Sequence, residues 1–405
     1  MKTFRIFVIF TILALAFTGC KAKVEVPTED LTISLWTQEG ESDNAYQYVV
    51  SLTDAFTALY PNITFEVVQK DTETLREDFQ TASLAGAAPD LLWTVSDHAG
   101  PFTTAGLIQP VQDYFDMDLY VPSVVMNDQT WAVPISSGNH LMLIYNKDLV
   151  AEPPTTTDEL ISMGQELTHD DQYGLVYNET EPFFIAPWWG GFGESVFAAD
   201  GVTPTLNTEA MVNTLQFLYD LKYTYKITPA SMDYDTADTL FKEGKAAMLV
   251  NGDWSLGGYQ EVLGDKLGVA PLPKVTATDT YPAAYTSGKY FMLPKDLAGA
   301  KLNAVIKFIE FATNEENQLN QLSTLSRLPG LKSVLSNEAI SSDPILAGSS
   351  LAMSYGIPMP TVVEMRCVWD AIKPEQTLVF AGSETPTDAA AAMQAAAEAC
   401  ILQLE

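Results

Sequence analysis

Basic residues and histidines are scarce in this chain. Among its 405 residues, 21 are Lys or Arg and 52 are Asp or Glu, which gives a formal net charge of −31. Such a surface repels phosphate backbones and anionic lipid, so it argues against a nucleic-acid partner and against a basic membrane-surface helix. The three histidines form no HExxH or HxH pattern and the cysteines are far apart, so we expect no metal site and no cofactor.

The motifs of the common catalytic sites are missing as well. The chain contains no G-x-S-x-G and no G-x-G-x-x-G, and Gly288-Lys289 lacks both the upstream glycine and the following Ser or Thr of a P-loop. Paired carboxylates could serve a glycoside hydrolase, but 52 acidic residues make such pairs common, and the sequence does not place two of them across a bond. We therefore expect a protein that is not an enzyme, and a surface glycoside hydrolase stays the less favoured alternative.

A long apolar run occurs only at the N-terminus. Residues 1–19 predict a signal peptide, because a basic start precedes the apolar run 6–17 and small residues follow it. The segment Phe17-Thr18-Gly19-Cys20 resembles a bacterial lipobox, although Leu is the usual residue in place of Phe17. This implies a lipid on Cys20, a lipidated tether over 20–30, and a location outside the cytoplasm, in the periplasm or at the cell surface. The alternative is a secreted protein with an incidental cysteine.

Two further cysteines, Cys367 and Cys400, lie near the C-terminus. Outside the cytoplasm a leftover pair of cysteines can form a disulfide. Both fall in segments with a helical pattern that could pack together. The sequence leaves two alternatives open: a disulfide between them, or two buried thiols.

The hydrophobic periodicity alternates between the strand type and the helix type along the chain. Within the first hundred residues the order is strand, helix, strand, helix, strand, which predicts an α/β fold with a largely parallel sheet. The predicted strands are 31–36, 63–68, 89–95, 141–146, 173–177, 246–252, 267–273 and 285–293. The predicted helices are 42–60, 72–85, 156–167, 208–226, 235–243 and 388–403.

Large aromatic residues gather beside proline and glycine. The stretch EPFFIAPWWGG, residues 181–191, is the densest example, and the seven tryptophans lie at or near the ends of predicted elements. An aromatic ring matches the apolar face of a pyranose, and carboxylates bind its hydroxyls through charge-assisted hydrogen bonds. Any single Trp is more often a core residue. The set as a whole, with Asp97, Glu181 and Lys373 nearby in sequence, favours a small-ligand site.

Several segments resemble one family. LMLIYNKDLV (141–150) resembles the signature of the extracellular solute-binding proteins of ABC importers, family 1, and FKEGKAAMLVNGDW (241–254) resembles their second-lobe segment. EPFFIAPWWGG and VVEMRCVWDAIK (362–373) look most like the maltose/maltodextrin-binding cluster. The resemblance implies a type II-like periplasmic-binding-protein fold, with two discontinuous lobes joined by a hinge and a ligand cleft between them. The implied lobes are 31–138 with 284–338, and 142–279 with 344–405.

The same resemblance implies the ligand residues. The positions that match hydroxyl-binding carboxylates and stacking rings are Asp97, Glu181, Trp254 and Trp369. Three positions depart from the cluster's usual Arg, Arg and Tyr, namely His98, Lys373 and Phe183. A carboxylate expected after the segment AVPI is missing, since the chain continues with residues 136–140, SSGNH. With Gln38, Glu39 and Trp188 added, the predicted ligand set is Gln38, Glu39, Asp97, His98, Glu181, Phe183, Trp188, Trp254, Trp369 and Lys373.

These observations predict a lipid-anchored, monomeric binding protein. Its partners would be a sugar, in first place a maltodextrin-like oligosaccharide, and the permease subunits of an ABC transporter that receives the sugar unaltered. Because three polar positions depart from the cluster, the identity of the sugar stays open. The alternative keeps the fold with a non-sugar ligand such as a polyamine or a peptide, since aromatic boxes also hold cations.

Overall fold

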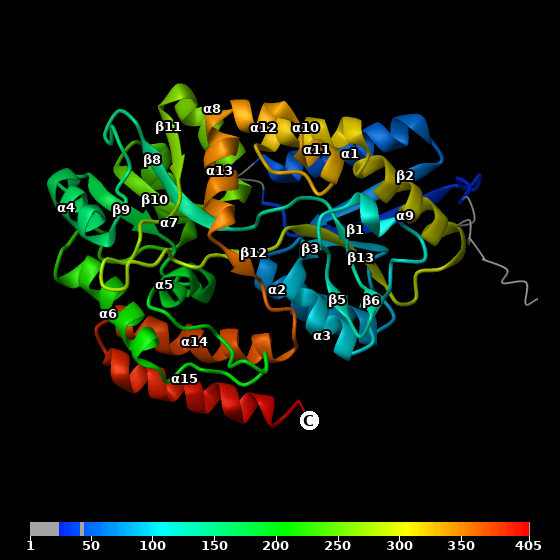
Figure 1. Ribbon diagram of the computed structural model, residues 1–405. Coiled ribbons are helices and arrows are strands. Elements are labelled where there is room, and N and C mark those ends of the chain that lie inside the picture. The colour runs from blue at the N-terminus through cyan, green and yellow to red at the C-terminus, as the bar shows by residue number, and fades with distance from the viewer. Residues whose placement is uncertain (1–23, 41–43, 405) are drawn as a thin grey trace, which may run out of the picture.

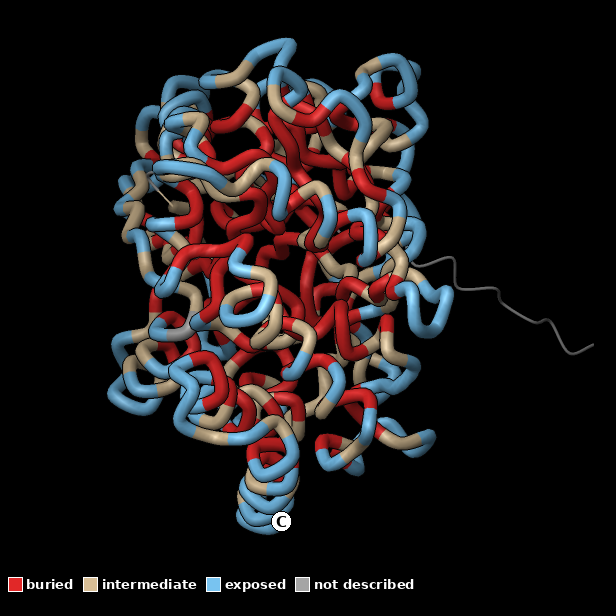
Figure 2. The backbone as a smooth tube through the Cα atoms, turned by 90° about the vertical axis from the view of Figure 1, so that its left-hand side faces the viewer, coloured by how far each residue is buried: buried red, intermediate tan, exposed pale blue. Residues whose placement is uncertain are grey.

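A computed structural model describes residues 24–40 and 44–404, so the predicted signal peptide and Cys20 lie outside the described residues. The chain forms two lobes, each built on its own large β-sheet (Figure 1). Buried segments fill the interior of the molecule and exposed segments surround them (Figure 2). Within the described ranges, no helix combines the length and the apolar character needed to cross a bilayer.

The first lobe contains a sheet in the order β2-β1-β3-β13-β4, with β7 beside β13. Strands β2, β1 and β3 are parallel, and β13 runs antiparallel to β3, β4 and β7. The strands are β1 (Leu31–Thr37), β2 (Ile63–Gln69), β3 (Leu91–Val95), β4 (Ile108–Gln109), β7 (Val133–Pro134) and β13 (Lys289–Pro294). The prediction of a largely parallel sheet is therefore right for β2-β1-β3 and wrong beyond it, because β13 returns from the other lobe instead of following a crossover helix.

Helices cover both faces of the first sheet. Leu91 and Trp93 of β3 point to one face, where Phe56 of α1 and Phe308 of α9 pack, and Leu92 points to the other, against α2 and α3. This arrangement explains why β3 is buried along its whole length. The helices of this lobe are α1 (Ala45–Leu59), α2 (Thr72–Leu84), α3 (Ala99–Thr104), α9 (Gly299–Ala312) and α10 (Glu315–Leu325).

The second lobe contains a sheet in the order β11-β8-β10-β9. Strand β8 lies antiparallel to β11 and β10, and β9 is parallel to β10. Every residue of β8 and β10 is buried, which fits their continuous apolar sequences. The strands are β8 (Leu141–Asn146), β9 (Tyr173–Tyr177), β10 (Ala246–Gly252) and β11 (Leu267–Ala270).

Helices α4 to α8 and α13 to α15 surround this second sheet (Figure 1). Helix α4 begins after Thr156, whose side chain accepts a hydrogen bond from the backbone N–H of Glu159. The helices are α4 (Thr157–Leu167), α5 (Ala186–Gly191), α6 (Glu209–Tyr223), α7 (Tyr234–Lys242), α8 (Leu256–Leu263), α13 (Pro344–Ser354), α14 (Glu364–Phe380) and α15 (Pro386–Ile401).

The chain crosses between the lobes after β7, before β13 and between α10 and α13. At two of these crossings Gly138 and Ser287 exchange backbone hydrogen bonds of 3.0 and 2.7 Å. Gly138 has φ +125°, and a Cβ there would lie 2.2 Å from the Oδ2 of Asp253. The crossing therefore requires glycine, both for its backbone conformation and for the close approach of Asp253.

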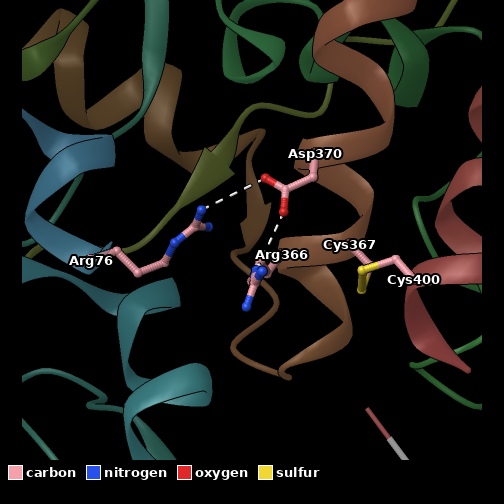
Figure 3. The surroundings of a disulfide bond; sticks show 5 residues. All are labelled: Arg76, Arg366, Cys367, Asp370 and Cys400. Carbon is pink, nitrogen blue, oxygen red and sulfur yellow. Dashed lines mark hydrogen bonds and ion pairs between the residues drawn. A yellow bond between two sulfur atoms is a disulfide. The ribbon is translucent and has the colours of Figure 1, made fainter. Parts of the chain in front are cut away.

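Cys367 of α14 and Cys400 of α15 form a disulfide, with their Cα atoms 5.5 Å apart (Figure 3). Of the two alternatives that the sequence left open, the structure has the bonded one. Cys367 is fully buried between the two helices. Because α14 also carries Trp369 and Lys373, the disulfide ties a segment with predicted ligand residues to the C-terminal helix.

Candidate ligand-binding site

Four aromatic rings from four separate segments meet in one cluster. Phe183, from the short helix η4 (Pro182–Phe184), has its ring centroid 6.0 Å from that of Trp254 and 6.5 Å from those of Trp369 and Tyr285. Tyr285 and Trp369 are 6.1 Å apart. The three predicted rings are half-buried, so part of each remains accessible, whereas Tyr285 is buried. We call Phe183, Trp254, Trp369 and Tyr285 the ring cluster.

Trp254 is held in place from several sides. It belongs to the short helix η5 (Asp253–Ser255), and its Nε1 donates a hydrogen bond of 3.1 Å to the hydroxyl of Tyr234. Its backbone carbonyl accepts a bond of 2.9 Å from Nη2 of Arg327, which belongs to the first lobe. A Cβ at Gly252 would lie 2.0 Å from the indole, so glycine is needed for the ring to lie over the end of β10. The structure thus fixes the orientation of this ring before any ligand arrives.

Trp188 is not part of the ring cluster. It is 1% exposed and packs at 5.0 Å against Phe217 of α6, in the core of the second lobe. Helix α5 lies close to the chain that leads from β11 to β13. Cβ atoms at Gly190 and Gly191 would come within 2.5 and 2.7 Å of Ala283 and Val275 in that segment. The glycines allow close packing here and do not turn the chain toward a ligand. The prediction of Trp188 as a ligand-facing ring is therefore wrong.

The two predicted carboxylates differ in their surroundings. Asp97, in the short helix η2 (Ser96–His98) at the end of β3, is half-buried and has no hydrogen bond or ion pair to another described residue. Glu181, two residues before Phe183, accepts a hydrogen bond of 2.7 Å from Nζ of Lys373 on α14. Asp97 thus offers an unused acceptor, and Glu181 with Lys373 offers a paired acceptor and donor beside the rings.

Glu39 and Gln38, at the end of β1, are engaged inside the first lobe. Oε1 of Glu39 accepts bonds of 2.7 Å from Nη1 of Arg327 and 2.9 Å from Nε1 of Trp93. Oε1 of Gln38 accepts a bond of 3.2 Å from the hydroxyl of Thr94. Burial raises the pKa of Glu39, but the charges of Arg327 and Lys289 outweigh it and leave the pKa below its ordinary value. Glu39 is therefore an ionised partner of Arg327 and not an open ligand group.

His98 is also buried, at 3% exposure, with its Nδ1 2.7 Å from the hydroxyl of Thr94. Burial lowers its pKa to about 4; the charge of Asp97 opposes this shift, and the charges of Arg76 and Lys289 add to it. The imidazole is neutral at pH 7, and it cannot supply the permanent positive charge of the Arg that the maltodextrin binders have at this position.

The low pKa of His98 gives the free energy of unfolding a dependence on pH. Between pH 6.5 and pH 4 the unfolded chain binds a proton at His98 and the folded chain does not, so the stability rises with pH through this window. From pH 7 to pH 5 we expect the wild type to lose about 2 kcal/mol more than the variant His98→Gln, as measured by urea unfolding. His169→Gln, at an exposed histidine, is the matched control. If His98→Gln and the wild type lost the same free energy of unfolding between pH 7 and pH 5, the lowered pKa of His98 would be contradicted.

Several contacts join the two lobes, and one of them involves a residue of the ring cluster. Nη2 of Arg76, on α2, lies 3.7 Å from Oδ1 of Asp370 on α14, and Nε of Arg366 donates to the other oxygen of Asp370 (Figure 3). The hydroxyl of Ser326, at the end of α10, donates a bond of 2.6 Å to Gln260 of α8. With the bond from Arg327 to Trp254, these contacts join the lobes at three separate pairs of residues.

A cavity of about 500 Å³ lies beside the crossing segments and contains none of the ten predicted ligand residues. Its lining includes Ser96, Ser287, Met353, Met359 and Thr361, it carries no carboxylate, and Tyr290 is its only aromatic residue. Nor do the described residues contain a group of three His, Cys, Asp or Glu side chains suited to a metal. The chemistry of the rings, and not the size of the cavity, therefore locates the candidate site.

Sequence reasoning missed four residues that shape this site: Tyr285, Tyr234, Lys289 and Arg327. Tyr234 stands between two aspartates and Tyr285 lies in the segment AAYTSG, and neither position carries a separate signal. Lys289 is a basic residue at the start of the otherwise apolar strand segment KYFMLP, and in a chain with only 21 basic residues that position was a usable signal. Arg327 lies in a loop 288 residues from Glu39, and no local pattern connects the two.

Comparison with known proteins gives consistent results. Residues 51–348 match the family model described as bacterial extracellular solute-binding protein. A maltose/maltodextrin-binding domain from Bdellovibrio bacteriovorus, solved bound to maltotriose, is 36% identical, with a TM-score of 0.88 over 92% of this chain and 100% of that one. A maltotriose-binding protein of Pyrococcus abyssi is 28% identical over 82% of this chain and 74% of its own length. A maltooligosaccharide ABC transporter solute-binding lipoprotein of Streptococcus pneumoniae is 25% identical over 71% of each chain.

Proposed function

The chain belongs to the bacterial extracellular solute-binding proteins, and from this membership we propose that it captures a maltodextrin-like oligosaccharide at the ring cluster and hands it unaltered to the permease of an ABC transporter. The family, the two-lobed periplasmic-binding-protein fold and the resemblance to the maltose-binding cluster are confirmed. The protein is a binding protein and not an enzyme, and it acts outside the cytoplasm.

The ring cluster is the observation that carries the proposal. Phe183, Trp254 and Trp369 present half-buried aromatic faces, which suit the C–H faces of glucose units. Asp97 on the first lobe and Glu181 on the second supply carboxylate acceptors for hydroxyl groups. Such a set of flat apolar surfaces and a few polar groups fits an oligosaccharide better than a polyamine or a peptide.

Binding would act on the equilibrium between open and closed lobes. We take the lobes to span 31–138 with 284–338 and 142–279 with 344–405, hinged at the crossing segments. A ligand that contacts both Asp97 and the ring cluster binds only when the lobes are together, so its differential affinity shifts the population toward the closed form. The contacts of Arg76 with Asp370 and of Ser326 with Gln260 join the two lobes and would stabilise this form. The permease would recognise the same form.

The predicted lipid on Cys20 would hold the protein at the membrane. The lipobox-like sequence supports this part of the proposal, together with the lipoprotein name of the Streptococcus pneumoniae relative. Acyl chains contribute about 0.8 kcal/mol per buried methylene, so a diacylglycerol on Cys20 would anchor the chain firmly. We propose a monomer, since the ring cluster is assembled from one chain.

The proposal is tested by a thermal-shift screen followed by calorimetric titration. Maltotriose and longer maltodextrins should raise the melting temperature of the mature protein and bind at one site, because a ligand that binds only the folded form stabilises it. Chromatography after overnight incubation should return the sugar intact. If spermidine or a peptide bound and maltodextrins did not, the proposed sugar ligand would be wrong. Release of shorter sugars during the incubation would favour a glycoside hydrolase.

A further inference from the structure

Lys289 occupies an unusual position for a lysine. It is the first residue of β13 and is only 8% exposed. Its backbone is fixed on both sides, since its N–H donates to the hydroxyl of Ser136 at 3.1 Å and its carbonyl accepts from the N–H of Ile135 at 2.7 Å. Two residues further along the strand, Phe291 packs into the core with Trp93, so Lys289 points to this same side of the sheet.

The ammonium of Lys289 reaches the second lobe. Its Nζ lies 5.8 Å from the centroid of the Trp254 ring, which is one of the predicted stacking surfaces. The nearby carboxylates are Glu39, Asp253 and Asp97. Glu39 binds Arg327 and Trp93, and Oδ2 of Asp253 accepts a bond of 3.1 Å from the backbone of Asn139. Of the three carboxylates near Lys289, Glu39 and Asp253 therefore already accept hydrogen bonds from other residues, and Asp97 does not.

Throughout the part of the chain that the structure describes, the Lys289 ammonium has no hydrogen bond and no ion pair. An ammonium carries three N–H donors, and leaving such donors unused in a buried place is unfavourable. Burial accordingly lowers the pKa of Lys289, although Glu39 opposes the shift. A group of this kind beside a ligand-facing ring is suited to donate to whatever rests on that ring.

We propose that Lys289 is a ligand-contacting residue whose ammonium donates hydrogen bonds to hydroxyl or ring oxygens of the sugar unit stacked on Trp254. The inference rests on the proposed function and adds a contact from β13 that the resemblance did not supply. Neutral oxygens are the better partners here, because Glu39, Asp97 and Asp253 would repel an acidic sugar. The contact would also link the two lobes through the ligand, since Lys289 and Trp254 come from different lobes.

The competing explanation is structural, with Lys289 only stabilising the lobe contact through the face of Trp254. The two roles predict different responses to Lys289→Met and Lys289→Gln. In the ligand role, Lys289→Met leaves the melting temperature of the sugar-free protein unchanged or raises it, since a buried charge is removed, while affinity for maltotriose falls about 10- to 100-fold. Lys289→Gln keeps an N–H donor and should bind with intermediate affinity.

The experiment compares wild type, Lys289→Met, Lys289→Gln and the matched control Lys307→Met by calorimetric titration with maltotriose and by thermal unfolding without sugar. Lys307 lies on α9 of the same lobe and pairs with Glu310. The variant Lys307→Met should therefore bind maltotriose with the affinity of the wild type. If the wild type binds maltotriose and Lys289→Met binds it with the same affinity, this inference is overturned and the proposed function stands. Equal losses in both Lys289 variants together with a lowered melting temperature also overturn it. A wild type that binds no maltodextrin overturns the proposed function and this inference together.

Discussion

The double variant Trp254→Ala, Trp369→Ala should bind maltotriose at least about 100-fold more weakly than the wild type and still fold. Each aromatic stack contributes about 0.5–1.5 kcal/mol beyond the apolar area that it covers, and the two stacks with their area exceed about 3 kcal/mol. A difference of about 1.4 kcal/mol corresponds to a tenfold change in affinity. Because both rings are half-buried, their removal disturbs the core less than the removal of Trp188 would.

Calorimetric titration of the double variant and of each single variant measures this loss. Trp36→Ala is the matched control, because Trp36 is also half-buried but lies on β1, next to Lys70 and away from the ring cluster. The affinity of Trp36→Ala for maltotriose should equal that of the wild type. Trp369→Phe should keep most of the affinity, since a smaller ring still stacks. Unchanged affinity in the double variant would remove the stacking role of these rings.

The elements that the sequence predicted best are those with an unambiguous hydrophobic pattern. Strands β8, β9 and β10 have the predicted bounds 141–146, 173–177 and 246–252, because a continuous apolar run between polar or glycine residues leaves little freedom in a buried strand. The direction of β13 was not predictable in this way. Its partner strands lie far away in sequence, and neither propensity nor periodicity encodes whether a returning strand runs parallel or antiparallel.

The site was predictable through resemblance and only partly through the residues themselves. Phe183, Trp254 and Trp369 belong to separate segments, and the structure brings them together. Pattern alone could not distinguish them from Trp188, since all four rings stand beside turn-forming or polar residues. The distinction arises from tertiary packing, because the short helix α5 fits between α6 and the crossing segment and places Trp188 inside.

Arg327→Met is the substitution with the largest expected effect on stability, with a loss of about 3–5 kcal/mol in the free energy of unfolding. The side chains of Arg327 and Glu39 are each 3% exposed, so removal of the guanidinium leaves a buried carboxylate without its nearest positive charge. It also removes the donor to the carbonyl of Trp254. Urea unfolding with linear extrapolation measures the loss.

The pH dependence of this loss follows from the direction of the Glu39 pKa. In the wild type the pKa is lowered, so the contribution of the ion pair is present above the unfolded value near 4.3 and disappears as the pH falls through the folded value. Without Arg327, burial still disfavours the charged carboxylate, so the pKa of Glu39 should rise above about 4.3. The stability gap between variant and wild type should therefore be widest toward pH 7 and narrow as the pH falls below about 4.3, closing only when the pH passes the lowered pKa of Glu39 in the wild type.

A second substitution separates the charge effect from simple loss of packing. In Glu39→Gln, Arg327→Met both charges of this pair are removed together, and the Gln carbonyl can still accept from Nε1 of Trp93. This double variant should recover more than half of the stability that Arg327→Met loses, and its stability should depend less on pH, since replacing both partners of a buried pair is milder than removing one. Equal stability of the single and double variants at pH 7 would show that the guanidinium acts through packing and through Trp254, and not through the charge of Glu39.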